Sequence, residues 1–236
     1  DDALLSRIMV QGPDPSMLGH GPVSFLDGLR FRLKLDFPMS EVFTDRALLQ
    51  YTRLFRIIAL AHHALERLKD AWSALAGLRD SGARGSLPPP TALIAFRHEL
   101  HYFTATIHRY LVVDVVATEF KHLENKVFEA SSLEELLDAH NSCLRRCVAR
   151  SFLEAGSQDA LTAVVGILDQ ALELAHLLEE IDLQSSLPAW AIARLRRIET
   201  TFSDLRRSFK LCYVEGGLAE AQTLVEEVLP TAYDLG

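Results

Sequence analysis

Apolar residues in this chain recur at steps of three and four positions, and this spacing constrains the fold more than any other feature. The clearest example is a run of apolar residues near the end of the chain: Ile192, Leu195, Ile198, Phe202, Leu205, Phe209 and Cys212. Because an α-helix has about 3.6 residues per turn, this spacing places the whole run on one helix face. Comparable stripes predict further helices at about 44–78, 91–129, 132–148, 159–181 and 218–229. The sequence therefore predicts an all-α fold, an elongated bundle of about six helices.

A short segment near the start of the chain has a different period. Four apolar residues alternate with four charged ones, in the order Leu29, Arg30, Phe31, Arg32, Leu33, Lys34, Leu35 and Asp36. A period of two residues is typical of a β-strand with one buried face. The alternation ends at Phe37-Pro38, where proline cannot donate a ladder hydrogen bond. We therefore expect a short extended strand or hairpin before the first long helix.

The length of the chain favours one domain with a single large core. A chain of this size buries roughly 70 to 75% of the surface that it exposes when unfolded, so one core is sufficient. We expect residues 1–236 to form that domain. Pro88, Pro89 and Pro90 follow two glycines in a stretch without apolar periodicity. Because consecutive prolines resist helix formation, we expect a flexible loop at about residues 80–90.

Composition and charge exclude several classes of partner. The formal net charge is −8 and the pI is about 5.6, so attraction of the whole surface to nucleic acid or anionic lipid is not expected. No run of about 20 apolar residues predicts a membrane helix. Three cysteines do not make a disulfide framework in so long a chain, which favours a reducing, intracellular compartment. We expect no nucleic acid and no membrane among the partners.

Sequence patterns for catalysis or metal binding are incomplete. The run His98-Glu99-Leu100-His101 is one residue short of the H-E-x-x-H spacing that places two imidazoles on adjacent helical turns. Cys143 and Cys147 lie one turn apart without the further ligands that zinc requires. A nucleophile elbow and a phosphate-binding glycine loop are also missing from the sequence. We expect no catalytic residue, no metal and no cofactor.

Three polar residues lie on predicted apolar stripes: His62, Asp114 and His140. We expect all three to be buried. A buried carboxylate without a partner costs several kcal/mol, so Asp114 should meet an arginine or a histidine of a neighbouring helix. A structural hydrogen-bond network explains these residues more simply than a catalytic dyad does.

Basic residues gather in three places, and two interpretations of them remain open. Arg30, Arg32 and Lys34 share the polar side of the predicted strand, and Arg53, Arg56 and Arg67 share one face of the first long helix. A third cluster lies near the end of the chain: Arg194, Arg196, Arg197, Arg206, Arg207 and Lys210. These charges either form docking surfaces or solvated faces, the third cluster being partly neutralised by the acidic tail that follows it.

Several motifs together resemble one protein family. They are Leu29-x-Phe31-x-Leu33-x-Leu35-Asp36-Phe37-Pro38-Met39, Leu48-x-x-Tyr51-x-x-Leu54-Phe55, Trp72, Tyr110-Leu111-Val112-Val113-Asp114-Val115, Phe120 and Leu133-Glu134-x-x-x-x-Ala139-His140-x-x-x-Leu144. Their order and content are similar to the carboxy-terminal domain of the gamma-tubulin complex components. Phe37 stands where that family usually has tryptophan, which indicates a divergent member.

The resemblance implies a scaffold without catalysis. Members of the family bind gamma-tubulin through this domain, together with other gamma-tubulin complex components, in a ring that nucleates microtubules. The implied location is the cytoplasm and cytoskeleton, at a microtubule organizing centre such as the centrosome or spindle pole. An acidic tubulin surface would dock on basic residues, which we expect to be Arg30, Arg32, Lys34, Arg53, Arg56 and Arg67.

Two other classes of protein share some of these features. A helical adaptor or vesicle-tethering subunit would have the same bundle and the same lack of catalytic motifs, but it would not explain the strand-Phe-Pro element and the tyrosine pattern that follows. An all-α lyase would need an aspartate-rich metal motif, which the sequence lacks.

Overall fold

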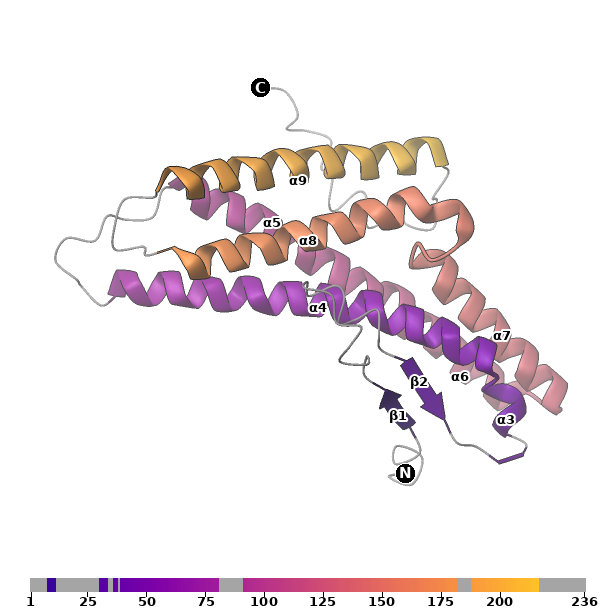
Figure 1. Cartoon of the computed structure of the whole chain (residues 1–236). Coiled ribbons are helices and arrows are strands. Elements are labelled where there is room, and N and C mark those ends of the chain that lie inside the picture. Colours follow the sequence, from indigo (N-terminus) through magenta and orange to yellow (C-terminus); the bar gives the residue numbers. More distant parts are fainter. Residues whose placement is uncertain are drawn as a thin grey trace. The chain divides into compact units, whose positions relative to one another are not determined.

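Helices make up most of the chain in a computed structural model, which describes residues 8–11, 30–33, 36–37, 39–80, 91–181 and 188–216. The predicted all-α class with a small extended element near its start is confirmed. The predicted helix at 218–229, and all but the first residue of the loop predicted at about 80–90, lie outside the described residues. The elements in chain order are β1 (Ile8–Gln11), β2 (Arg30–Leu33), α3 (Met39–Val42), α4 (Asp45–Asp80), α5 (Thr91–Arg109), the π-helix η2 (Tyr110–Ala117), α6 (Thr118–Glu129), α7 (Leu133–Arg150), the 3₁₀ turn η3 (Ala155–Ser157), α8 (Gln158–Glu180) and α9 (Ala189–Gly216) (Figure 1).

The extended element is a pair of antiparallel strands. Ile8 of β1 lies opposite Leu33 of β2, and Gln11 lies opposite Arg30. Strand β2 is attached to α4 through Phe31, whose backbone N–H donates to Thr52 Oγ1 at 3.1 Å. The ring of Phe31 also packs edge-on against Phe55, with 4.8 Å between the ring centroids. The alternating sequence therefore directs one side of β2 toward α4 and leaves the arginine side exposed.

The predicted helical region 91–129 is continuous, but its middle is a π-helix. Segment η2 joins α5 to α6 without a break. A π-helix bonds each residue to the one five positions earlier, and the hydroxyl of Thr118 donates to the carbonyl of Val113 over this same interval. The wider turn changes which residues face inward. Val115 is fully buried, whereas Asp114 beside it is partly exposed.

The ends of α7 have identifiable local causes. Ser132 caps the first turn, because its hydroxyl accepts from the backbone N–H of Glu135 at 3.2 Å. The carboxylate of Glu135 accepts from the backbone N–H and the hydroxyl of Ser131. After α7 the chain turns at Phe152, which has a positive φ of 61° and a ring that stacks on Tyr110. The buried ring of Phe152 holds this strained conformation in place.

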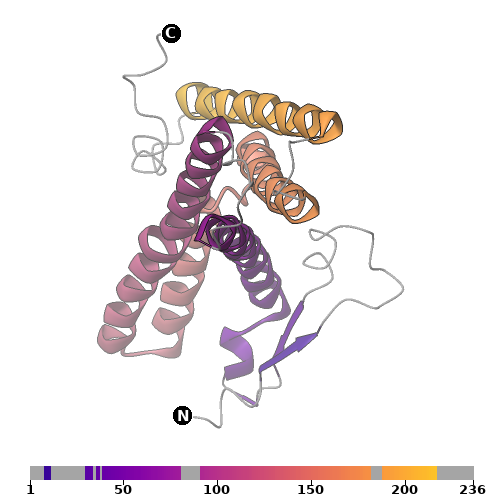
Figure 2. The ribbon, with the colours of Figure 1, turned by 90° about the vertical axis from the view of Figure 1, so that its left-hand side faces the viewer.

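The chain forms two compact units. Unit 1 consists of residues 1–60 and 109–158, and unit 2 consists of residues 61–108 and 159–236. In unit 1, α6 and α7 run side by side, as Figures 1 and 2 both show, and α3 contacts α7. That residues 1–236 form one domain stays a prediction.

Unit 2 has an aromatic core between α5 and α9. Phe202 of α9 packs edge-on against Phe96 and Phe103 of α5, with centroids 5.8 Å apart in both pairs. Helices α8 and α9 approach closely at Gly166, where an added Cβ would lie 2.9 Å from Leu205 Cδ1. The glycine inside α8 is therefore explained by packing against α9.

One helical stretch of the described part has the composition of a membrane span. Within Leu133–Glu180, an 18-residue window is long and apolar enough to cross a bilayer. The core helix of a folded domain has the same composition, and 56% of this window is buried inside the structure. Helix α8 alone has eleven buried residues, so packing within the fold accounts for the apolar run.

Candidate partner-binding surfaces

The arginines of strand β2 form an exposed basic site in unit 1. Arg30 and Arg32 lie on the side of β2 that faces away from α4, and both are exposed. Lys34, the third residue expected here, lies outside the described residues. The structure therefore leaves two guanidinium groups of this site accessible to a partner.

The arginines of α4 are engaged within the fold. Arg53 of unit 1 is half-buried, and its Nη2 donates to the carbonyl of Leu153 at 2.5 Å. Arg67 of unit 2 pairs with Glu179, with 2.6 Å between Nη2 and Oε2. Arg56 is also half-buried. These side chains were expected as a free basic ridge, but Arg53 and Arg67 stabilise the contacts of α4 with the chain around it.

The basic cluster of α9 is neutralised by carboxylates from other helices of unit 2. Arg194 pairs with Glu173 and Glu180 of α8, at 2.8 and 2.5 Å. Arg206 pairs with Glu99 of α5 at 2.5 Å. The acidic tail expected to supply this neutralisation lies outside the residues whose side chains are described. Arg194 and Arg206 are therefore part of helix packing in unit 2.

His140 sits in an aromatic pocket of unit 1. It is 5% exposed, and its Nε2 hydrogen-bonds the hydroxyl of Tyr51 at 2.9 Å. The ring of Phe43 packs edge-on against the imidazole. Burial lowers the pKa of His140 and raises the pKa of Tyr51, so both groups are neutral near pH 7. This pair joins α4 to α7.

His62 is exposed in the structure, so its predicted burial is wrong. It lies beside His108, with 5.3 Å between the ring centroids. The buried face of α4 instead includes Ala61 and Ala64, which are both 0% exposed, beside larger residues such as Leu68. The predicted stripe was defined by large apolar residues. The side of α4 that is buried includes these alanines and therefore differs from the predicted side.

Asp114 is only partly buried, and its partner differs from the predicted one. Its side chain is 27% exposed and lies 3.5 Å from Arg109. We expected full burial and a donor from a neighbouring helix. Arg109 precedes it by five positions on the same continuous helix, which is the interval that a π-helix brings together. The α-helical period assumed for the sequence placed Asp114 on the wrong face.

Glu119 is a buried charged residue that sequence reasoning missed. Its side chain is 6% exposed and accepts from Arg146 Nε at 2.5 Å and Arg150 Nη1 at 3.0 Å. Burial raises the pKa of Glu119, but the hydrogen bonds from the two arginines outweigh this effect and leave it below its usual value. Leu111, Val115 and Glu119 follow one another at steps of four, but the sequence alone did not favour this run over the stripe through Tyr110 and Asp114.

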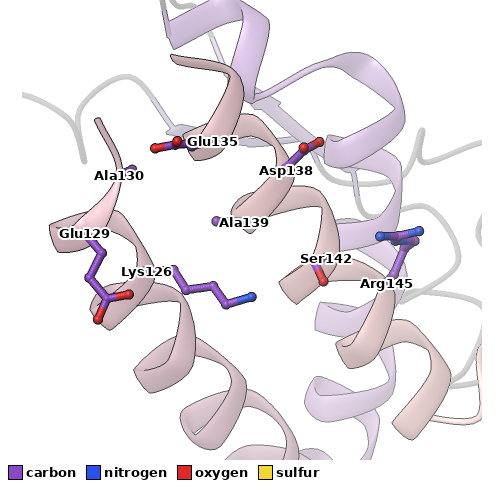
Figure 3. Close-up of a pocket in the computed structure, with 8 residues that line it drawn as sticks. All are labelled: Lys126, Glu129, Ala130, Glu135, Asp138, Ala139, Ser142 and Arg145. Atoms are coloured by element: carbon purple, nitrogen blue, oxygen red, sulfur yellow. The ribbon is translucent and has the colours of Figure 1, made fainter. Parts of the chain in front are cut away.

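A groove runs between α6 and α7 at the end of this helical hairpin. Its volume is about 630 Å³. Figure 3 shows Ala130, which follows α6, and Ala139 of α7 on either side of it, and Lys126 pointing from α6 toward α7. The lining residues are Lys126, Glu129, Ala130, Glu135, Asp138, Ala139, Ser142 and Arg145. A second hollow, of about 610 Å³, lies on the opposite side of α6 and is lined by Ala117, Phe120, Lys121, Leu123, Glu124, Val127 and Phe128.

The described residues offer no ready metal site. No group of three or more histidine, cysteine, aspartate or glutamate side chains in this part of the chain could hold a metal ion. Cys143 and Cys147 are buried, and the thiol of Cys143 donates to the backbone carbonyl of Glu119.

Comparisons with known proteins find one matching family and several related proteins. The family model described as "Gamma tubulin complex component C-terminal" matches residues 2–222. Gamma-tubulin complex component 4 of Arabidopsis thaliana is 22% identical over 186 residues, which cover 73% of this chain and 24% of that protein. Component 2 of Arabidopsis thaliana is 24% identical over 53% of the chain and 19% of its own length. The component 3 homolog of Xenopus laevis is 24% identical over 59% of the chain and 16% of its own length. The chain thus spans a quarter or less of these relatives.

Proposed function

This chain belongs to the gamma-tubulin complex component family, and from that membership we propose that it is a non-catalytic scaffold domain that binds gamma-tubulin. In this role it would position gamma-tubulin in the ring complex that nucleates microtubules. The observation that carries the proposal is the family match, which runs through both compact units and covers nearly the whole chain. Residues 1–236 then correspond to most of the carboxy-terminal helical domain of such a component.

The physical character of the chain supports a scaffold. Side chains far apart in sequence hold the helices together, as in the pairs of Glu119 with Arg150 and of Arg206 with Glu99. A scaffold needs such preorganised elements, because rigid surfaces lose less conformational entropy when a partner binds. Other gamma-tubulin complex components are the further partners that we propose. The proposed location is the cytoskeleton, at a microtubule organizing centre such as the centrosome or spindle pole.

We place the gamma-tubulin contact on the basic side of β2. Arg30 and Arg32 are exposed there. Lys34 and Arg56 belong to the proposed site because of their places in the sequence. Arg53 is bonded within unit 1 and would support the site, and Arg67, which is bonded within unit 2, stays in the proposal by its place in the sequence alone. Interfaces are enriched in arginine, and charge mainly sets the rate and specificity of association.

Co-sedimentation with purified gamma-tubulin tests the proposal directly. The wild-type chain should bind, and the double variant Arg30→Glu/Arg32→Glu should bind more slowly and lose the salt dependence of association. The matched control is Arg196→Glu/Arg207→Glu on α9, which changes the charge by the same amount elsewhere and should leave binding unchanged. If the wild-type chain fails to bind gamma-tubulin while it captures a vesicle-tethering partner, the scaffold proposal is wrong and the adaptor interpretation replaces it.

A further inference from the structure

Helix α6 exposes its apolar residues and buries a charged one. Glu119 is the one buried residue of this helix, all of which the structure describes. Phe120, Val127 and Phe128 are 44%, 43% and 84% exposed. A helix packed into a closed fold normally turns its apolar stripe inward. We call the hollow surface formed by Ala117, Phe120, Lys121, Leu123, Glu124, Val127 and Phe128 the outer face of α6.

The orientation of α6 is fixed by its buried side. Both carboxylate oxygens of Glu119 are bonded to arginines of α7, and the thiol of Cys143 donates to the Glu119 carbonyl. Turning α6 to bury Phe128 would pull Glu119 away from Arg146 and Arg150 and leave charges without partners. The outer face is therefore held outward by the fold. Neighbouring apolar side chains that the fold keeps exposed are a reason to look for a partner on this face.

The charge at the end of the hairpin is acidic. We call the exposed charged residues around the turn the acidic tip: Lys126, Glu129, Glu134, Glu135 and Asp138. Four carboxylates stand against one ammonium, a surplus of three negative charges. On the outer face itself, Lys121 and Glu124 pair with each other at 2.9 Å and cancel.

The acidic tip has the opposite sign to the arginines of β2. A surface that suits an acidic partner at Arg30 and Arg32 does not suit the same partner here, because like charges across an interface are unfavourable. Hydrogen bonds from the backbone and hydroxyl of Ser131 lower the pKa of Glu135, so this carboxylate remains ionised at neutral pH. The tip therefore selects a basic partner.

The groove of Figure 3 lies on the other side of α6 from the outer face, so a partner on the outer face can reach only the end of the groove near the turn. Ala130 and Ala139 leave space between the two helices, and Glu135 and Asp138 lie at the end of the groove near the turn. Lys126 points into the groove and Arg145 also lines it, so the carboxylates offered to a lysine or arginine of the partner are those beside the turn.

We propose that the outer face of α6 and the acidic tip together bind an amphipathic helix of a second partner protein. The apolar stripe of that helix covers Phe120, Val127 and Phe128, and its flanking lysine or arginine side chains meet the carboxylates of the tip. This is the helix-in-groove mode of recognition, in which apolar anchors at helical spacing supply affinity and flanking charges supply specificity. The site is additional to the proposed gamma-tubulin contact at β2.

The test uses two synthetic peptides and the full chain. One peptide is an amphipathic helix of leucine and lysine, and the other has glutamate in place of every lysine. Fluorescence anisotropy should show that the lysine peptide binds and is weakened by salt, whereas the glutamate peptide does not bind. Phe128→Asp should weaken binding about tenfold or more, because exposed aromatic anchors carry much of the affinity of an interface. Glu134→Lys/Asp138→Lys should weaken binding and abolish its salt dependence.

Two control variants test whether each effect is specific to this face. Leu49→Asp changes another exposed apolar residue of unit 1, and Glu154→Lys changes another exposed carboxylate. Both should bind the lysine peptide as the wild-type chain does. Circular dichroism confirms that all variants keep the same helix content.

Three results would overturn the proposal, each in a distinguishable way. Equal binding of both peptides, or no effect of Phe128→Asp, would show that the face is not a selective docking site. Loss of gamma-tubulin binding in Phe128→Asp, with binding retained in Arg30→Glu/Arg32→Glu, would assign the face to gamma-tubulin itself. A dimer of the wild-type chain that Phe128→Asp dissociates would assign it to a second copy.

Discussion

Replacing Glu119 by glutamine tests the contact that holds α6 to α7. The carboxylate binds Arg146 and Arg150 at once, and its side chain is 6% exposed. Glutamine keeps the size of the side chain but removes the charge. Removing one partner of a buried ion pair costs about 3 to 5 kcal/mol, chiefly because the remaining charge is left unpaired. The side chains of Arg146 and Arg150 are 37% and 21% exposed, so both keep access to water. We therefore expect the lower end, about 3 kcal/mol.

Urea denaturation followed by far-ultraviolet circular dichroism is the appropriate assay. Trp72 and Trp190 both belong to unit 2, so their fluorescence would not report on this contact in unit 1. The control is Glu124→Gln on the same helix, whose exposed pair with Lys121 should contribute less than about 1 kcal/mol. A loss below about 0.5 kcal/mol for Glu119→Gln would refute the reasoning, since that is the range of ordinary surface substitutions.

The same contact predicts a pH dependence. The folded pKa of Glu119 is held below its unfolded value by the two arginines, despite the opposing effect of burial. Its stabilisation is therefore fully present above the unfolded pKa of about 4.3 and is lost as the pH falls through the folded pKa. The difference in urea midpoint between the wild type and Glu119→Gln should be largest near neutral pH and should shrink in acid.

Two further substitutions test individual contacts of unit 1. Tyr51→Phe removes the hydroxyl that pairs with the buried His140, so thermal denaturation should show a loss of about 1 to 2 kcal/mol. Because burial lowers the pKa of His140, protonation favours the unfolded chain, and the thermal midpoint of the wild type should fall as the pH drops below about 6.5. Asp114→Asn should cost less than about 1 kcal/mol in urea denaturation, because this ion pair is partly exposed. A cost near 3 kcal/mol would mean that Asp114 is buried, as its sequence position first indicated.

Long helices with regular stripes could be predicted because burial follows their period. In α9, the predicted core residues Ile198, Phe202 and Phe209 are at most 2% exposed. The residues that α4 spans were predicted, but the side of the helix that is buried was not. Its buried face includes Ala61 and Ala64, and alanine gives a weak signal because its high helix propensity also favours it on exposed helix faces.

The partners of the charged residues could not be predicted, since they come from helices distant in sequence. Arg67 and Glu179 are 112 positions apart, and Arg206 and Glu99 are 107 apart. A sequence shows which residues are charged and on which face of a helix they lie. It does not show which helices will be neighbours, and the neighbours decide whether an arginine is free for a partner or is used within the fold.

The π-helix η2 explains why prediction failed at both Asp114 and Glu119. A stripe with α-helical spacing runs from Phe103 through Ile107 and Tyr110 and would bring Asp114 inward. The wider turn of η2 rotates the residues after it, so Val115 becomes buried, and Glu119 follows it one α-helical turn later. Glu119 then meets the arginines of α7, and the opposite side of α6, which carries Phe128, faces outward. One local change in helix type therefore determines both the buried ion pairs of this hairpin and the surface that we propose as a docking site.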